Sequence, residues 1–126
     1  MNVKIDTKEK FTVITPTDTT FSANMTDNIQ TYLEAYLTKD IPHVVLNMKH
    51  VEDIDEISGK TLASIQQLFY DKSCSFVICE MQKNVEEKLD ELELLEVMNT
   101  TPTESEAWDI VQMEEIEREL LGGFDE

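Results

Sequence analysis

Residues 52–61 hold the densest group of polar side chains in the sequence. Either Asp55 or Ser58 can cap a following helix, because a side-chain oxygen at that place accepts a bond from a free backbone N–H. A Ser58 hydroxyl exposed at the start of a helix is also a candidate phosphoacceptor. Free N–H groups would bind the phosphate, whereas the carboxylates of Asp53, Asp55 and Glu56 would repel it. The simpler alternative is that Ser58 only caps the helix.

The same segment lacks the spacing of a calcium loop. An EF-hand loop needs an oxygen ligand two residues after Asp55, where Ile57 stands, and a glycine directly after that ligand. His43 and His50 are the only imidazoles, and neither has a Ser or Cys partner in a recognisable catalytic arrangement. The sequence also lacks the glycine motifs that bind dinucleotides or phosphates. We therefore expect no metal, no cofactor and no enzyme activity.

Two strands and a helix are predicted to position this polar segment. Residues 43–48 form a compact apolar run that is typical of a central strand, and residues 75–80 form another. Between them, Leu62, Ile65 and Phe69 recur at helical spacing. A strand–helix–strand order makes the two strands parallel neighbours through a right-handed crossover. The polar segment then joins a strand's carboxyl end to a helix's amino end, where α/β sheets commonly place recognition surfaces.

The rest of the chain alternates between short strands and helices. Residues 3–6 and 11–15 are expected to form a hairpin, residues 17–24 are rich in turn formers, and residues 97–100 suit a short edge strand. The sequence therefore predicts an α/β domain with a mixed sheet. Apolar residues at helical spacing predict three further helices: Met25, Ile29, Leu33 and Tyr36 in the first, Val85, Leu89 and Leu92 in the second, and Trp108, Val111 and Ile116 on or near the buried stripe of the third.

The ends of two of these helices carry recognisable signals. Thr26 or Asn24 is expected to cap the first helix, which should stop before a proline at position 42. Thr103 and Glu106 have the spacing of a capping box at the start of the last helix. The Gly122–Gly123 pair is expected to end that helix.

Composition narrows the class of protein. The chain has 126 residues, the usual size of one domain, and a net charge of −17, which would repel nucleic acid and an anionic membrane. No apolar run is long enough to span a bilayer or to form a signal peptide, so we expect a soluble cytoplasmic protein without membrane insertion. Cys74 and Cys79 are expected to be reduced thiols, with Cys79 in the core. Residues 80–126 carry −13 of the charge, which either keeps a helical face solvated or steers a basic partner.

The order of these elements resembles the STAS domain of bacterial anti-sigma factor antagonists. The resemblance covers roughly residues 3–120 and is most specific between residues 43 and 80, where the spacing from strand to strand fits without a gap. It rests on the strand at 43–48, on Val51, Ile54 and Asp55, and on the apolar helix and strand that follow. The family's fold implies four to five strands in a mixed sheet with about four helices. We therefore interpret residues 1–126 as a single STAS-like domain, with an acidic C-terminal helix and short tail at 104–126.

The resemblance also implies a function. In that family, a strand ends in a hydrophobic-Asp-Ser-Ser-Gly segment, and the second serine is phosphorylated by a partner kinase that is also the anti-sigma factor. The unphosphorylated domain binds this kinase and so frees the sigma factor. Matched without a gap, Asp55 falls on the family's Asp, Glu56 on the first Ser, Ile57 on the phosphoacceptor and Ser58 on the Gly. A one-residue slip would place Ser58 and Gly59 on the Ser-Gly pair, but it would rotate the helix's apolar stripe.

The leading hypothesis is therefore a non-catalytic regulatory domain that binds a kinase-type anti-sigma factor through residues 53–61. The residues predicted to contact that partner are Asp53, Asp55, Glu56, Ile57, Ser58 and Gly59. Switching by phosphate should be lost at Ile57 unless Ser58 substitutes as the acceptor. The main alternative is a small-ligand or lipid sensor that uses an apolar pocket between sheet and helices. A small enzyme, and a structural domain that dimerises through the strand at 3–6, are the remaining alternatives.

Overall fold

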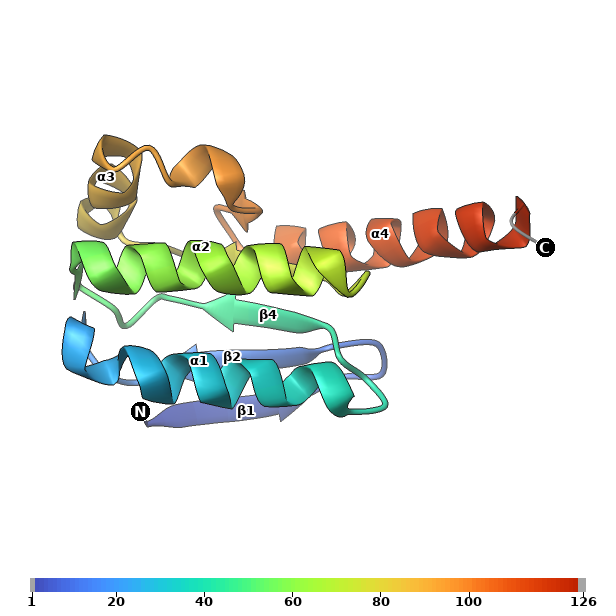
Figure 1. Ribbon diagram of the computed structural model, residues 1–126, viewed down its shortest axis with the longest axis horizontal. Helices are drawn as coiled ribbons and strands as arrows, with labels where there is room; N and C mark the ends of the chain where they lie inside the picture. The colour runs from blue at the N-terminus through green and yellow to red at the C-terminus, as the bar shows by residue number, and fades with distance from the viewer. Residues whose placement is uncertain (1, 125–126) are drawn as a thin grey trace.

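The computed structural model describes residues 2–124, which form a mixed five-stranded sheet covered by helices on both faces (Figure 1). The strand order is β1-β2-β4-β6-β7; β1 runs antiparallel to β2, and every other neighbouring pair is parallel. This arrangement confirms the predicted mixed sheet and the parallel central pair. The strands are β1 (Val3–Thr7), β2 (Thr12–Pro16), β4 (Val44–Asn47), β6 (Phe76–Cys79) and β7 (Thr100–Thr101).

Four α-helices in the described part of the chain cover the two faces of the sheet and bury two apolar clusters. Side chains alternate along each strand, so Leu46 and Ile78 point into the cluster under α1, α2 and α3, while Val45 and Val77 point into the cluster under α4. Because both faces are covered, β4 and β6 are buried along their whole length, as their continuous apolar runs predicted. The helices are α1 (Thr26–Glu34), α2 (Glu56–Asp71), α3 (Lys83–Glu91) and α4 (Glu104–Phe124).

The segment before α1 differs from the prediction. A short 3-10 helix, η1 (Ala23–Met25), leads into α1, and a second, η2 (Ala35–Thr38), follows it. Neither Asn24 nor Thr26 caps α1: the Thr26 hydroxyl donates to the carbonyl of Ala23 at 2.9 Å. Helical structure begins earlier than expected because a carboxylate from another element accepts the Ala23 N–H, as described below.

Two very short strands were also missed. Residues 17–24 and 52–56 were expected to be turn and loop, but β3 (Thr20–Phe21) and β5 (Asp53–Ile54) lie within them and pair in parallel as a separate sheet. At the other edge, η3 (Leu95–Val97) occupies the start of the expected strand at 97–100, and β7 begins at Thr100. A strand of two residues is too short to show the alternation of apolar and polar residues by which strands are predicted from a sequence.

The last helix confirms one prediction and corrects two. Thr103 caps α4 as predicted, since its hydroxyl accepts the Glu106 N–H at 3.2 Å. The glycine pair does not end the helix, because α4 continues through it to Phe124. Ile116 was placed on or near the buried stripe but is 57% exposed, because the second half of α4 extends past the sheet (Figure 1). No helix within residues 2–124 combines the length and apolarity needed to cross a membrane.

Candidate functional site

The turn that leads into α2 is held by backbone pairing on one side. β4 ends at Asn47, and after a loop the chain pairs with β3 through Asp53 and Ile54. The Asp55 N–H then donates to the carbonyl of Phe21 at 3.0 Å. Ile54 is buried beneath the turn, so backbone and core fix the position at which α2 begins. We call residues 53–59 the α2 N-terminal turn.

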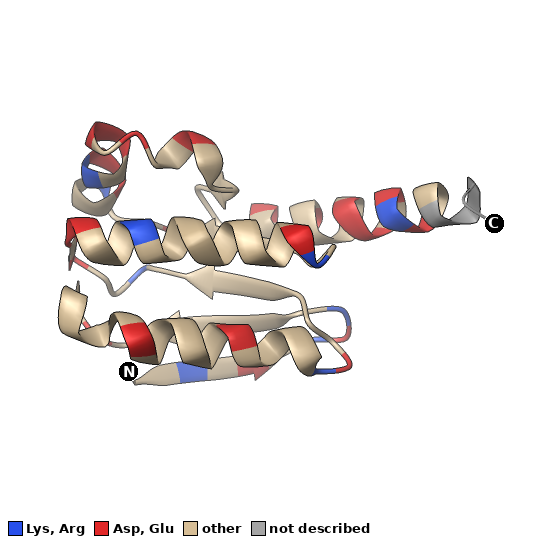
Figure 2. Ribbon diagram, in the orientation of Figure 1, with Lys and Arg blue, Asp and Glu red and all other residues tan. Residues whose placement is uncertain are grey.

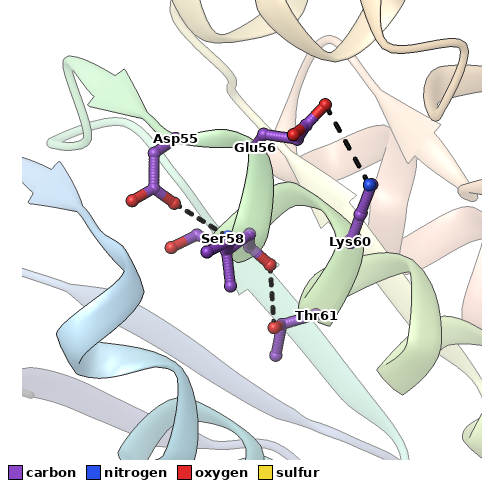
Figure 3. Close-up of polar contacts among 6 residues, drawn as sticks. Asp55, Glu56, Ser58, Lys60 and Thr61 are labelled. Carbon is purple, nitrogen blue, oxygen red and sulfur yellow. Dashed lines mark hydrogen bonds and ion pairs between the residues drawn. The ribbon is translucent and has the colours of Figure 1, made fainter.

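Asp55 is the central residue of this turn. Its backbone is extended, and its carboxylate Oδ1 accepts the Ser58 N–H at 2.8 Å (Figure 3). Of the two residues expected as possible caps of α2, Asp55 is therefore the cap, and the alternative that Ser58 caps the helix is wrong. The second oxygen, Oδ2, accepts the Ala23 N–H at 2.6 Å at the start of η1. One side chain therefore satisfies free N–H groups of two helical segments, one of which begins at Ala23, 32 residues before Asp55.

These bonds set the charge state of the turn. The backbone N–H of Ser58 lowers the pKa of Asp55 most, although burial opposes the shift, and the nearby Ser58 hydroxyl, the Ala23 N–H and the Lys88 ammonium lower it further. Asp55 is therefore ionised at neutral pH. Its charge is compensated by the amino ends of two helical segments, so Asp55 serves mainly to hold the turn in one conformation.

The outer surface of the turn is formed by three exposed side chains. Asp53 and Glu56 are exposed, and Ile57, which directly follows Glu56, presents an apolar side chain that is 53% exposed. Glu56 lies 4.0 Å from Lys60 across one helical turn, a loose pair that leaves the carboxylate free to meet another group (Figure 3). The turn therefore exposes one apolar side chain and two carboxylates, on a backbone that hydrogen bonds hold in place.

Ser58 does not lie where the sequence analysis placed it. Its hydroxyl was expected to be exposed, but the residue is only 1% exposed, and its Oγ has no hydrogen-bond partner among residues 2–124. The sequence carries the reason: Leu62, Ile65 and Phe69 follow at four, seven and eleven residues, so Ser58 continues the buried stripe of α2. The helical spacing in the sequence therefore predicts that Ser58 is buried.

Gly59 is also buried, directly beneath the turn. A Cβ on this residue would lie 2.9 Å from Leu89 Cδ2 and 3.2 Å from Leu94 Cδ1, so the absence of a side chain lets α3 and its following loop approach α2 closely. The structure thus divides the predicted contact residues into two groups. Asp53, Glu56 and Ile57 are exposed and Asp55 is half-buried, whereas Ser58 and Gly59 form the support underneath.

Two amide side chains that support this region were missed. Asn84 Nδ2 donates to the carbonyl of Glu52 at 2.9 Å, and Gln82 Nε2 donates to the carbonyl of Lys49 at the same distance. Both come from the start of α3 and hold the loop between β4 and β5. No sequence signal marks them, because a neutral amide near a helix start has many alternative partners.

The imidazole and thiol groups lie elsewhere. His43 precedes β4, and its Nδ1 accepts the Ser75 N–H at 3.0 Å. Burial and the nearby Arg118 guanidinium lower the pKa of His43. Cys79 is fully buried as predicted, and burial, together with the carboxylates of Glu104 and Glu80, raises its pKa to about 12. A thiol with that pKa is a poor nucleophile at neutral pH.

Comparisons with known proteins agree with this fold. The family model described as the STAS domain matches residues 2–107. A candidate anti-sigma factor antagonist of Thermotoga maritima is 18% identical, with a TM-score of 0.76 over 87% of this chain and 94% of its own. A STAS-domain protein described as an anti-sigma factor antagonist from Planctomyces limnophilus is also 18% identical, with a TM-score of 0.73 over 87% of this chain and 97% of its own.

A membrane transporter contains the same fold. The murine anion transporter Slc26a9 is 14% identical, with a TM-score of 0.69 over 82% of this chain but only 18% of its own. No curated protein matches the sequence significantly. At identities of 14–18%, the structural similarities establish the fold alone. A function for this chain must therefore be argued from the residues of its own α2 N-terminal turn.

Proposed function

Because this chain belongs to the STAS-domain family, we propose that it is a non-catalytic regulatory domain that binds a kinase-type anti-sigma factor through the α2 N-terminal turn. In this proposal the partner binds ATP and this chain does not. The proposal places the chain in the cytoplasm, where ATP is available to that partner. The resemblance to anti-sigma factor antagonists supports the class of partner, and the turn supports the place of contact.

The observation that carries the proposal is the exposed Ile57 on a turn that is already rigid. Burial of a half-exposed isoleucine against a partner removes apolar surface from water and so contributes favourable free energy to binding. The bonds that Asp55 makes to Ser58 and Ala23 fix the backbone before binding, so little conformational entropy is lost on association. Asp53 and Glu56 are exposed on the same turn and would favour a partner surface that combines an apolar pocket with basic groups.

Phosphate control is proposed to differ from the family pattern. The family's phosphoacceptor position falls on Ile57, which has no hydroxyl. Ser58 remains the candidate acceptor, but its burial imposes a condition: a kinase reaches its Oγ only after the first turn of α2 opens. Mass spectrometry of the peptide that contains Ser58, isolated from the native cell, tests whether this modification occurs.

The alternative of a small-ligand or lipid sensor requires an apolar pocket between sheet and helices. Within residues 2–124 that space is filled by buried side chains, among them Leu46, Leu62 and Ile78. No specific observation therefore favours the sensor over the docking domain, and the docking domain is the function we propose.

The proposal is tested by affinity capture from a lysate of the native organism with two matched variants. Ile57→Asp changes the proposed contact, and Ile116→Asp makes the same change at an isoleucine of similar exposure on the far part of α4. We expect the wild type and Ile116→Asp to recover a protein with a kinase-type ATP-binding domain. Ile57→Asp should lose that protein while keeping the wild-type circular dichroism spectrum. Recovery of the same proteins by all three would contradict the assignment of the contact surface.

A further inference from the structure

The outer edge of β1 is open among the described residues. β1 is the first strand of the sheet, and Lys4, Ile5, Asp6 and Thr7 are exposed. Ile5 is 53% exposed, although it lies opposite Ile14 of β2, which is completely buried. An exposed edge strand with an apolar residue at its centre is a template for another strand.

The register between β1 and β2 shows which backbone groups point outward. The Thr17 N–H donates to the carbonyl of Asn2, and the Lys8 N–H donates to the carbonyl of Phe11. In an antiparallel pair, hydrogen-bonded positions alternate with positions that are not bonded to the partner strand. The even-numbered residues of β1 therefore bond to β2, and the N–H and C=O groups of residues 3, 5 and 7 face away from it.

These outward groups are symmetric about Ile5. If a second copy of β1 pairs antiparallel with Ile5 opposite Ile5, residue 3 of each copy lies opposite residue 7 of the other. All three outward residues then exchange backbone hydrogen bonds. In the same register Lys4 lies opposite Asp6 of the second copy, and Asp6 lies opposite Lys4. The strand is therefore complementary to itself in hydrogen bonding, in apolar contact and in charge.

The overall charge of the protein does not oppose this contact at the β1 edge. The chain carries −17, and most of the negative charge lies in the last third of the sequence (Figure 2). The hairpin of β1 and β2, in contrast, has three lysines, at positions 4, 8 and 10, against Asp6 and Glu9. The hairpin therefore has no excess of acidic residues. Two copies that meet at β1 would not bring two acidic surfaces together through this hairpin.

We propose that two copies of this chain associate through β1 in this register, forming a two-fold symmetric dimer with one continuous sheet. The two five-stranded sheets would then form one sheet of ten strands. The contact is a single pair of short strands, well below the roughly 1,200 Å² of standard interfaces, so the dimer forms reversibly at high protein concentration. The inference does not depend on the proposed function, because β1 lies outside the α2 N-terminal turn.

Charge-swap variants and sedimentation velocity test the register. Lys4→Asp places a carboxylate opposite Asp6 of the second copy, and Asp6→Lys places an ammonium group opposite Lys4, twice in each dimer. Both single variants should weaken dimerisation by about ten-fold or more. The double variant, Lys4→Asp with Asp6→Lys, restores opposite charges at both places and should dimerise like the wild type.

The net charges make this test specific. Each single swap changes the charge of the chain by two, so Lys4→Asp has −19, Asp6→Lys has −15, and the double variant keeps −17. If net repulsion alone governed association, Asp6→Lys would dimerise more strongly than the wild type, which would overturn the proposed register. A wild type that stays monomeric into the millimolar range would overturn the dimer itself. Unchanged melting temperatures of the variants, all exposed substitutions, would show that the fold is kept.

Discussion

At the residue scale, Asp55 connects the starts of two helical segments. Its carboxylate accepts one N–H from α2 and one from η1, and both bonds belong to the turn that we propose as a docking surface. Replacing Asp55 therefore changes the rigidity of the surface as well as its charge. For that reason Ile57, which projects outward and makes no comparable bonds, is the better probe of binding.

Asp55→Ala is expected to destabilise the protein by about 1–2 kcal/mol, because two N–H groups lose their acceptor. Asp53→Ala, an exposed carboxylate without a capping bond, is the control and should change stability by about 0.5 kcal/mol or less. Urea unfolding measures both. Equal effects of the two variants would contradict a stabilising role for the two bonds that Asp55 accepts, from Ser58 and Ala23.

The effect of Asp55 should depend on pH in a definite direction. The folded-state pKa of Asp55 is lowered, so the carboxylate stabilises the fold above the unfolded-state pKa of about 3.9, and this stabilisation is lost as the pH falls through the folded-state pKa. The difference between wild type and Asp55→Ala should therefore shrink in acid.

Ser58 allows a second prediction at this scale. Since its buried hydroxyl has no partner within the described residues, Ser58→Ala should be neutral or stabilising by up to about 1 kcal/mol. Ser58→Asp would bury a second carboxylate beside Asp55 and should cost roughly 3 kcal/mol or more. Thermal and urea unfolding distinguish the two. A clear loss of stability in Ser58→Ala would mean that the hydroxyl has a partner.

At the element scale, the contact between His43, Ser75 and Arg118 fastens α4 to the beginnings of β4 and β6. Arg118 Nη1 donates to the Ser75 hydroxyl at 3.1 Å, and its Nη2 lies 3.4 Å from His43 Nε2. This contact lies near the point where α4 leaves the sheet. It links the extended half of the helix to the strands that build the core.

This contact predicts a pH dependence of stability. Burial and Arg118 lower the folded-state pKa of His43, so the unfolded chain binds a proton more readily than the folded one. The contribution of neutral His43 to stability is complete above the unfolded-state pKa of about 6.5 and is lost as the pH falls through the folded-state pKa. His43→Gln, which keeps a hydrogen-bond acceptor, should flatten the fall in unfolding free energy between about pH 7 and 5. An unchanged pH profile would contradict this assignment.

Some of the strands and helix caps could be predicted from the sequence, and others could not. The strands β4 and β6 were predictable because both faces of the sheet are covered, which produces continuous apolar runs. β3 and β5 were not, because their pairing depends on a contact between distant segments. Residue type and position predicted a cap by either Asp55 or Ser58, and the structure shows that it is Asp55. Its second bond, to Ala23, depends on how α1 lies beside α2, which no local pattern contains.

The exposure of particular side chains was harder to predict than the elements. The position of Ser58 at a helix start predicted an exposed hydroxyl, although helical spacing places the residue on the buried stripe of α2. The spacing of Ile116 from Trp108 and Val111 predicted a place on or near the buried stripe, although the helix has left the sheet at that point (Figure 1). In both cases packing decides exposure, and residue type alone does not.

At the scale of the whole molecule, charge is the dominant feature. Acidic side chains are concentrated on α3 and α4, with few basic ones among them (Figure 2). A net charge of −17 on a chain of 126 residues produces repulsion within the folded state, and unfolding relieves part of it.

Salt should therefore stabilise the protein. Raising NaCl from about 0.05 M to about 0.5 M shortens the screening length and should raise the melting temperature by a few degrees, about 1 kcal/mol in a domain of this size. The four ion pairs found within residues 2–124 are between largely exposed groups, so their screening should not offset this gain. Differential scanning calorimetry measures the shift, and a melting temperature that falls with salt would contradict the role given to repulsion.

The proposed function requires the α2 N-terminal turn to contact a protein partner. Site-specific photocrosslinking in the native cell tests it most directly, with a photoreactive amino acid in place of Ile57 and, as the control, in place of Ile116. We expect an adduct from position 57 to a protein with a kinase-type ATP-binding domain, and no such adduct from position 116. No adduct from position 57, or the same adduct from both positions, would contradict it.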